Sequence, residues 1–322
     1  MRAVALLFLA TSLATAQFKS TATLVIAPTT VIDAKGKYVD GLEPGNLVLY
    51  DNGVAQPIQV DESFNPISLV VAVQTSANSA GILDKLGTSG VLFSDLLAGD
   101  RGETAIVTFS DEVRVARDFT GNADLLKKAL ASLHVQGTGA VALDGVSQAF
   151  RMLAARKQDH RRILLVVAEK RDRSSKTKFS AILHEAQRQN VLVYWLTYSP
   201  FLEPFTAQQK TVKSQDPDLD GRPLPPDMAP GNLLSVFGEL ARQGKPDSSE
   251  QLTRATGGRA VHFLKKEALE DAIQEIASEV HRQYVVSFTP RPGRPGEFHA
   301  IRIGVKGHPE WIARTRAGYW SL

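Results

Sequence analysis

The stretch ISLVVAVQTSANSAG, residues 67–81, decides how this chain folds. Its first seven residues are apolar apart from one Ser, small polar residues follow Gln74, and then a helical pattern starts. Such an apolar run is typical of a strand buried on both faces of a parallel sheet. Because α/β proteins bind ligands where such strands end, the loop QTSAN is the first candidate site.

Strand-like and helix-like segments alternate around this stretch, from about residue 66 to residue 282. The further expected strands are 103–110, 113–120, 162–168, 191–198 and 260–263. The expected helices are 81–98, 122–133, 143–156, 179–189 and 266–283. This alternation predicts an α/β domain, a doubly wound and mostly parallel sheet with helices on both faces. The expected strands 103–110 and 113–120 are joined by a tight turn and add an antiparallel edge to the sheet.

The flanks of this domain, residues 17–65 and 283–322, contain short β-like runs separated by turn sequences such as EPGN and DNG. They predict a β-sandwich-like domain assembled from both ends of the chain, with the α/β domain (66–282) inserted between them. Two separate β extensions are the alternative. Residues 199–232 hold seven Pro and little periodicity, which predicts a Pro-rich loop inserted in the α/β domain.

Residues 1–16 have the three parts of a secretory signal peptide. Arg2 is basic, an apolar core follows, and the small residues Ala14-Thr15-Ala16 predict cleavage after Ala16. The apolar core is shorter than the ~20 residues that span a bilayer, and no later segment predicts a transmembrane helix. We therefore expect a secreted or periplasmic protein, with an uncleaved anchor as the alternative. The chain has no Cys, which excludes disulfides and a lipidated Cys.

The composition excludes several function classes. The net charge of +3 is small for 322 residues, so we expect no nucleic-acid partner. The seven His show no metal-ligand spacing, no G-x-S-x-G motif occurs, and thiol chemistry is impossible without Cys. We therefore expect that the protein is not an enzyme; a hydrolase whose site is not recognisable from sequence is the alternative.

Three separated segments carry a family resemblance: VIDAKGKYVDGLEPGNLVLYDNGVAQPI (31–58), ISLVVAVQTSANS (67–79), and HRQYVVSFTPRPGRPGEFHAIRIGVKG with ARTRAGYW (281–307 and 313–320). In this order they resemble the leading, metal-loop and closing segments of the secreted bacterial VWFA-related proteins, which contain a von Willebrand factor type A domain. The resemblance implies a type A α/β fold and a non-enzymatic module for protein–protein interaction or adhesion in the bacterial envelope.

The same resemblance assigns roles to the polar loop. Working type A domains bind Mg²⁺ through an Asp-x-Ser-x-Ser loop, a Thr and a further Asp. Here Gln74 stands at the first Asp, Ser76 at the first Ser and Asn78 at the second. Mg²⁺ requires about six oxygen ligands, among which carboxylates offset its charge. Gln and Asn offer carbonyl oxygen without that negative charge.

The remaining two metal positions also depart from the motif. Ala140 occupies the Thr position, and Thr138 fits only if its loop shifts by two residues. Glu169 stands at the last Asp, with Asp172 nearby. The resemblance therefore implies a degenerate metal site, without a cofactor, whose rim binds an unidentified protein partner. A metal-dependent adhesin that binds Mg²⁺ or Ca²⁺ is the alternative.

The retained loop has two interpretations. In the first it only connects strand to helix, and Ser76, Asn78 and Ser79 cap the helix that follows. In the second, polar side chains of the rim bind a partner without metal, and these are Gln74, Asn78, Lys170 and Arg171.

The Pro-rich loop contains a second candidate cation site. Asp216, Asp218 and Asp220 alternate, Gly221 is sixth and Asp227 twelfth, which is the spacing of a calcium loop. Pro at positions eight, ten and eleven, and no clear helix before the loop, favour a solvated acidic loop. Calcium binding by these residues is the alternative.

Overall fold

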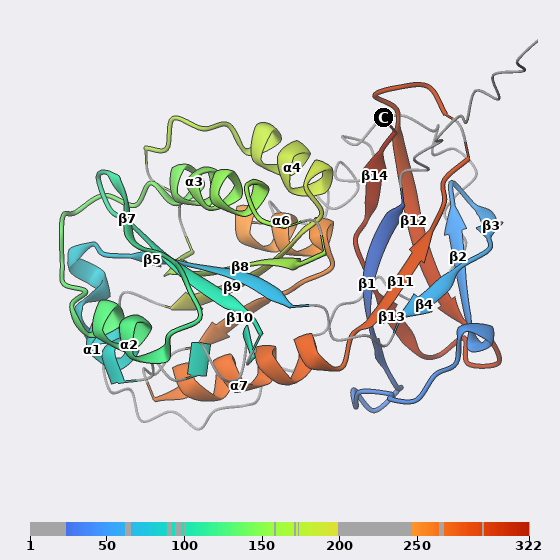
Figure 1. Ribbon diagram of the computed structural model, residues 1–322, viewed down its shortest axis with the longest axis horizontal. Coiled ribbons are helices and arrows are strands. Elements are labelled where there is room, and N and C mark those ends of the chain that lie inside the picture. Colours follow the sequence, from blue (N-terminus) through green and yellow to red (C-terminus); the bar gives the residue numbers. More distant parts are fainter. Residues whose placement is uncertain are drawn as a thin grey trace, which may run out of the picture.

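The computed structural model describes residues 24–61, 66–88, 92–93, 98–99, 101–157, 159–170, 172, 174–198, 247–263, 267–291 and 293–321. These residues form an α/β module, on the left in Figure 1, and a β-sandwich, on the right. From residue 24 the chain passes through the sandwich, then through the module, and returns to the sandwich. No helix among the described residues is long and apolar enough to cross a membrane.

The module is built on a six-stranded sheet with the order β10-β9-β8-β5-β6-β7. The strands are β5 (Ile67–Gln74), β6 (Glu103–Phe109), β7 (Val113–Thr120), β8 (Arg161–Glu169), β9 (Val191–Tyr198) and β10 (Ala260–Phe263). They pair in parallel except for β7, which runs antiparallel to β6 at one edge. The predicted fold class, with its antiparallel edge, is confirmed.

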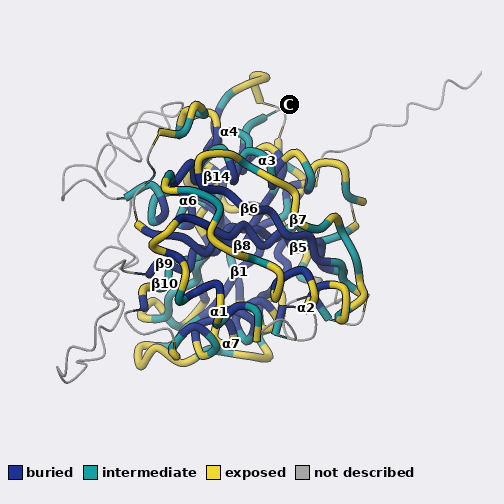
Figure 2. Tube along the Cα trace, turned by 90° about the vertical axis from the view of Figure 1, so that its left-hand side faces the viewer, coloured by how far each residue is buried: buried dark blue, intermediate teal, exposed yellow. Residues whose placement is uncertain are grey.

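Helices cover both faces of this sheet (Figures 1 and 2). They are α1 (Ala80–Thr88), α2 (Ala123–Ala131), α3 (Ala142–Ala154), α4 (Phe179–Arg188), α6 (Ser248–Thr256) and α7 (Ala268–His281). The helices α1, α2 and α7 contribute to one apolar cluster, and α3, α4 and α6 contribute to the other. Of the expected helix 81–98, α1 covers residues 81–88, and residues 92, 93 and 98 are also helical; residues 89–91 and 94–97 lie outside the described residues.

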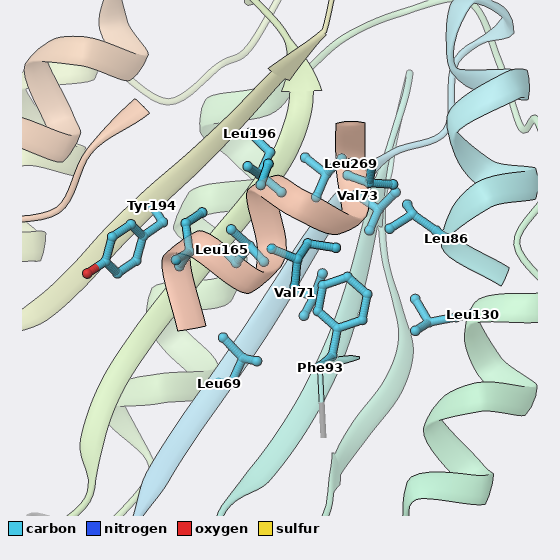
Figure 3. Close-up of a cluster of buried hydrophobic side chains, with 14 of the residues drawn as sticks. Leu69, Val71, Val73, Leu86, Phe93, Leu130, Leu165, Tyr194, Leu196 and Leu269 are labelled. Carbon is cyan, nitrogen blue, oxygen red and sulfur yellow. The ribbon is translucent and has the colours of Figure 1, made fainter. Parts of the chain in front are cut away.

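The pattern of β5 follows from its position in the middle of the sheet. Leu69, Val71 and Val73 pack into the cluster under α1, α2 and α7, and Figure 3 shows the three along β5, with Leu86 of α1 near Val73. Val70 and Ala72 pack into the opposite cluster, so every residue of β5 is buried. A strand between two helical layers therefore requires the continuous apolar run that the sequence shows.

The sandwich combines both flanks of the chain. One sheet has the order β13-β1-β11-β4 and the other β14-β12-β2-β3. The strands are β1 (Val25–Ile32), β2 (Leu47–Asp51), β3 (Val54–Gln56), β4 (Gln59–Asp61), β11 (Tyr284–Phe288), β12 (Phe298–Val305), β13 (Ile312–Arg314) and β14 (Gly318–Trp320). The short 3₁₀ helices are η1 (Pro44–Asn46) and η2 (Ala77–Ser79), the latter in the module. Because β1 pairs with β11 and β13, and both sheets share one apolar cluster, neither flank has a core of its own.

A buried carboxylate joins the sandwich to the module. Glu279 on α7 has no exposed surface and forms ion pairs with Arg259, at 2.7 Å, and with Arg314 of the sandwich, at 2.5 Å. Tyr194 and Tyr38 also donate hydrogen bonds to it. Burial alone raises the pKa of Glu279, but Arg314 and Arg259 outweigh it and hold the pKa below its ordinary value.

A buried arginine makes a second connection. Arg316 donates to Oδ1 of Asn190 at 2.6 Å and to the backbone carbonyl of Gln187, which lies in the last turn of α4. Such carbonyls carry the negative end of the helix dipole, which suits a guanidinium. Burial lowers the pKa of Arg316 to about 10, so it remains charged at neutral pH. Asn190 directly precedes β9, so the sandwich lies at the amino ends of the parallel strands.

Candidate functional site

The polar loop lies at the opposite, carboxyl end of the sheet. Gln74 is the last residue of β5, and Glu169 is the last residue of the neighbouring parallel strand β8. Both side chains are buried, with 1% and 3% of the residue exposed. Two residues that are 95 positions apart in the chain therefore meet because their strands pair in register.

Gln74 and Glu169 interlock through hydrogen bonds in both directions. The backbone N–H of Glu169 donates to Oε1 of Gln74 at 2.9 Å, which fixes the orientation of the amide because an N–H cannot accept. Nε2 of Gln74 then points the other way and donates to Oγ of Ser76 at 2.7 Å and to Oε1 of Glu169 at 3.3 Å. The amide of Gln74 is thus used on both of its sides.

Asn78 strengthens this arrangement from the exposed side of the loop. Its Nδ2 donates to Oε1 of Glu169 at 2.8 Å, while the residue itself is exposed. The same carboxylate oxygen therefore accepts from the amide groups of both Gln74 and Asn78. Two amide groups therefore help to hold this buried carboxylate in place.

The prediction that Ser76, Asn78 and Ser79 cap the next helix is wrong. Ser76 stands at the N-cap of η2, but its side chain makes no capping hydrogen bond. Its Oγ lies 3.3 Å from Oγ of Ser79, which in turn lies 2.6 Å from Oη of Tyr198 at the end of β9. Burial raises the pKa of Tyr198, which keeps its hydroxyl neutral. The serines hold the loop to neighbouring strands instead of capping the helix.

The loop 136–141 lies directly against the polar loop. The N–H of Gln136 donates to the carbonyl of Thr75 at 2.8 Å, and the N–H of Ala77 donates to the carbonyl of Gly137 at 3.0 Å. Thr138 is exposed, whereas Ala140 is buried and has no polar side-chain atom. The exposed residues Asn78 and Thr138 thus lie on two loops that are joined backbone to backbone; we call this edge the rim.

One residue of this edge, Asp111, was not predicted. Its carboxylate accepts hydrogen bonds from the N–H groups of Thr138, at 3.2 Å, and Gly139, at 2.9 Å. A Cβ on Gly137 would lie 2.2 Å from Oδ2 of Asp111, and one on Gly139 would lie 2.9 Å from the carbonyl oxygen of Ser110. Two glycines on either side of Thr138 therefore let the loop fold closely around Asp111, and they were the only signal in the sequence.

Asp172, the alternative to Glu169 at the last metal position, has another role. Its Oδ1 accepts from the backbone N–H of Leu143 at 3.2 Å and from the hydroxyl of Ser175 at 2.6 Å. The N–H of Leu143 belongs to the first turn of α3, where helix N–H groups lack partners within the helix. Asp172 thus stabilises the start of α3.

The groups around Glu169 do not fit the oxygen shell that Mg²⁺ requires. Gln74 and Asn78 both turn an NH₂ group toward it, and an amide NH₂ is a donor that cannot bind a cation. Ala140 has no ligand atom, and Thr138 is exposed on the rim. In the part of the chain that the structure describes, no three His, Asp or Glu side chains are grouped to hold a metal ion.

Two further sequence predictions lie outside the described residues. The candidate calcium loop, with Asp216, Asp218, Asp220 and Asp227, is one of them, and the signal peptide 1–16 is the other. Arg171, named above for the rim, also lies outside them. These remain predictions from the sequence.

No protein-family model matches the chain, and no curated protein matches it in sequence. Solved structures resemble it in fold. An aerotolerance-related membrane protein from Bacteroides fragilis is 14% identical, with a TM-score of 0.41 over 66% of this chain and 98% of its own. The conserved hypothetical protein BatB from Bacteroides thetaiotaomicron is 15% identical, with a TM-score of 0.42 over the same shares.

A third structure with a similar fold is the SpRpn10 VWA domain. It is 14% identical, with a TM-score of 0.34 over 42% of this chain and 76% of its own. Similarities at this level carry nothing about function. The strand order of the module, with five parallel strands, one antiparallel edge strand and helices on both faces, is by itself the arrangement expected of a von Willebrand factor type A fold.

Proposed function

We propose that this chain is a secreted or periplasmic protein-interaction protein whose module binds its partner at the rim without a metal ion. The observation that carries this proposal is the interlock of Gln74 and Glu169. A metal site would need these side chains to present oxygen atoms to one point. Here they are used in hydrogen bonds to each other, which leaves a fixed edge with neutral polar groups facing outward.

The exposed groups of the rim suit binding better than catalysis. Asn78 and Thr138 are exposed, and neither side chain titrates near neutral pH, so neither offers general acid or base chemistry. Both sit on loops that are fixed to the strands by backbone hydrogen bonds. Exposed polar residues on loops held by a rigid scaffold are a common arrangement for recognition.

The metal-free part of the proposal is tested by thermal unfolding. A ligand that binds only the folded state raises stability by RT ln(1 + [L]/Kd). We expect the same Tm in EDTA and in excess Mg²⁺ or Mn²⁺. A Tm that rises with the concentration of either ion would contradict metal-independent function.

The binding part is tested by photocrosslinking in the envelope fraction of the native organism. A photoreactive residue is placed at position 138 on the rim, and in a control protein at Lys306, which is exposed on the sandwich. We expect a discrete crosslinked species for position 138 in EDTA, competed away by unlabelled protein and absent for position 306. Equal crosslinking at both positions, or none at position 138, would refute the rim as the binding surface.

A further inference from the structure

Positive charge is concentrated in one short loop beside the rim. Residues 170–178, KRDRSSKTK, contain five basic residues and one acidic residue, a net charge of +4. The whole chain carries only +3, so the other residues together are slightly acidic. We call residues 170–178 the basic loop.

Two carboxylates beside the basic loop, Asp144 and Asp172, accept hydrogen bonds from backbone and hydroxyl groups. Asp144, in the first turn of α3, accepts from the N–H groups of Lys176, at 3.0 Å, and Thr177, at 2.8 Å, and from the hydroxyl of Thr177. Partial burial raises the pKa of Asp144, but these hydrogen bonds, together with the positive charge of Lys176, outweigh it and lower the pKa below its ordinary value. Asp172, within the loop, accepts a hydrogen bond from the N–H of Leu143 in the first turn of α3. The two carboxylates thus brace the loop against α3.

The lysines of the braced loop face outward. The side chain of Lys170 is 58% exposed, and its ion pair with Asp247 is long, at 3.8 Å. Lys176 and Lys178 are exposed, and no carboxylate of the described residues lies within ion-pair distance of either ammonium group. Three ammonium groups are thus available beside a backbone that Asp144 holds at Lys176 and Thr177.

The basic loop is continuous with the rim at both ends. Lys170 directly follows Glu169, the residue that Asn78 and Gln74 hold in place. At its other end the loop is bound to the first turn of α3, which follows the rim loop 136–141 in the chain. A partner seated on Asn78 and Thr138 therefore has the basic loop beside it.

We propose that Lys170, Lys176 and Lys178 bind an acidic segment of the protein partner. The inference rests on the proposed function, because it names the chemistry of the partner that the rim receives. Charges that face a partner across an interface steer association and select against partners of like charge. Since the loop is braced before binding, little backbone order is lost when the acidic segment docks.

The test uses the full mature chain and a fluorescein-labelled decapeptide of alternating Glu and Gly, followed by fluorescence anisotropy. We expect binding that weakens as salt is raised, and no binding of the matching Lys-Gly peptide. The triple variant K170Q/K176Q/K178Q should bind the acidic peptide about tenfold more weakly. The control K127Q/K128Q/K306Q removes the same charge from exposed lysines on α2 and the sandwich, and should change binding less than about twofold.

Three results would overturn the proposal: no binding of the acidic peptide, equal weakening in both triple variants, or tighter binding to single-stranded DNA or anionic vesicles than to the peptide. Equal weakening would mean that only net charge matters. The crosslink at position 138 separates this proposal from the proposed function. If that crosslink persists at equal yield in K170Q/K176Q/K178Q, the rim binds a partner and the acidic segment alone is refuted.

Discussion

Glu169 and Glu279 are both buried carboxylates, yet the molecule stabilises them in different ways. Glu169, at the carboxyl end of the sheet, accepts hydrogen bonds from two neutral amide groups. Glu279, where the sandwich meets the module, forms ion pairs with Arg259 and Arg314. Two amide groups donate to Glu169, whereas two guanidinium groups pair with Glu279. The comparison indicates that ion pairs fix the domain interface, while hydrogen bonds from amide side chains fix the candidate site.

The largest effect should come from Glu279→Ala. Removing one partner of a buried ion pair leaves an uncompensated charge, and here Arg259 and Arg314 would both lose their carboxylate, at a cost of about 3–5 kcal/mol. Urea unfolding followed by Trp fluorescence measures the loss. Glu275→Ala is the control, because Glu275 pairs with the same Arg259 but its side chain is 54% exposed. Similar losses in both variants would show that burial of the carboxylate is not decisive.

Protonation of Glu279 at low pH should destabilise the protein less than Glu279→Ala does, because the protonated side chain still fills its buried position. The folded-state pKa of Glu279 lies below its ordinary value, so its stabilisation is present above the unfolded-state pKa, about 4.3. It is lost as the pH falls through the folded-state pKa. We therefore expect the difference in Tm between wild type and Glu279→Gln to be constant from neutral pH to about 5 and to shrink below that. A Tm difference that grows as the pH falls would contradict the lowered folded-state pKa of Glu279.

The sequence predicted the features that local patterns encode better than those that depend on contacts between residues far apart in the chain. The run at β5 revealed a strand between two helical layers, because Leu69 and Val70 must face opposite apolar clusters. Gln74 and Glu169 were assigned to one site by the family resemblance, and the structure places them at the ends of the neighbouring parallel strands β5 and β8. The first inference uses the period of a strand and the order of elements, which a single sequence contains, whereas the second needed the motif of a family.

The missed features depend on contacts that no local pattern encodes. Asp111 reads as a turn residue, and only the folded hairpin brings it under the N–H groups of Thr138 and Gly139. Glu279 looks like a surface residue of an amphipathic helix, and it is buried because Arg314 reaches it from the sandwich. The capping roles expected of Ser76 and Ser79 were wrong because the end of β9 supplied a tertiary partner for Ser79.

Gln74→Glu should place a second carboxylate at the candidate site, without the arginines that stabilise Glu279 at the domain interface. Gln74→Glu removes the donated hydrogen bonds and places a second carboxylate beside Glu169, at a cost of about 1–3 kcal/mol at neutral pH. Two such carboxylates must share a proton, so stability should recover as the pH falls.

Gln74→Met is the matched control for this change, because it removes the same donors without adding a charge. Urea unfolding at pH 7 and pH 5 should show Gln74→Glu to be the less stable variant at pH 7, with a smaller difference at pH 5. Added Mg²⁺ should raise the Tm of Gln74→Glu and leave wild type and Gln74→Met unchanged. Identical behaviour of the two variants would mean that the neutrality of residue 74 is not what the site requires.

Asn78→Ala should have the smallest effect on stability and the sharpest effect on binding. Only one hydrogen bond is lost, at about 0.5–1.5 kcal/mol, because Gln74 still donates to the same oxygen of Glu169. Asn78→Asp keeps the size but places an acceptor against that oxygen, so its loss in urea unfolding should be larger. If the rim binds the partner, Asn78→Ala should lower the yield of the crosslink at position 138 far more than it lowers stability. Leu125→Ala, a truncation of another exposed side chain on α2, should leave that crosslink unchanged. Unchanged crosslinking in Asn78→Ala would leave this side chain with a structural role only, as one of the two amides that hold Glu169.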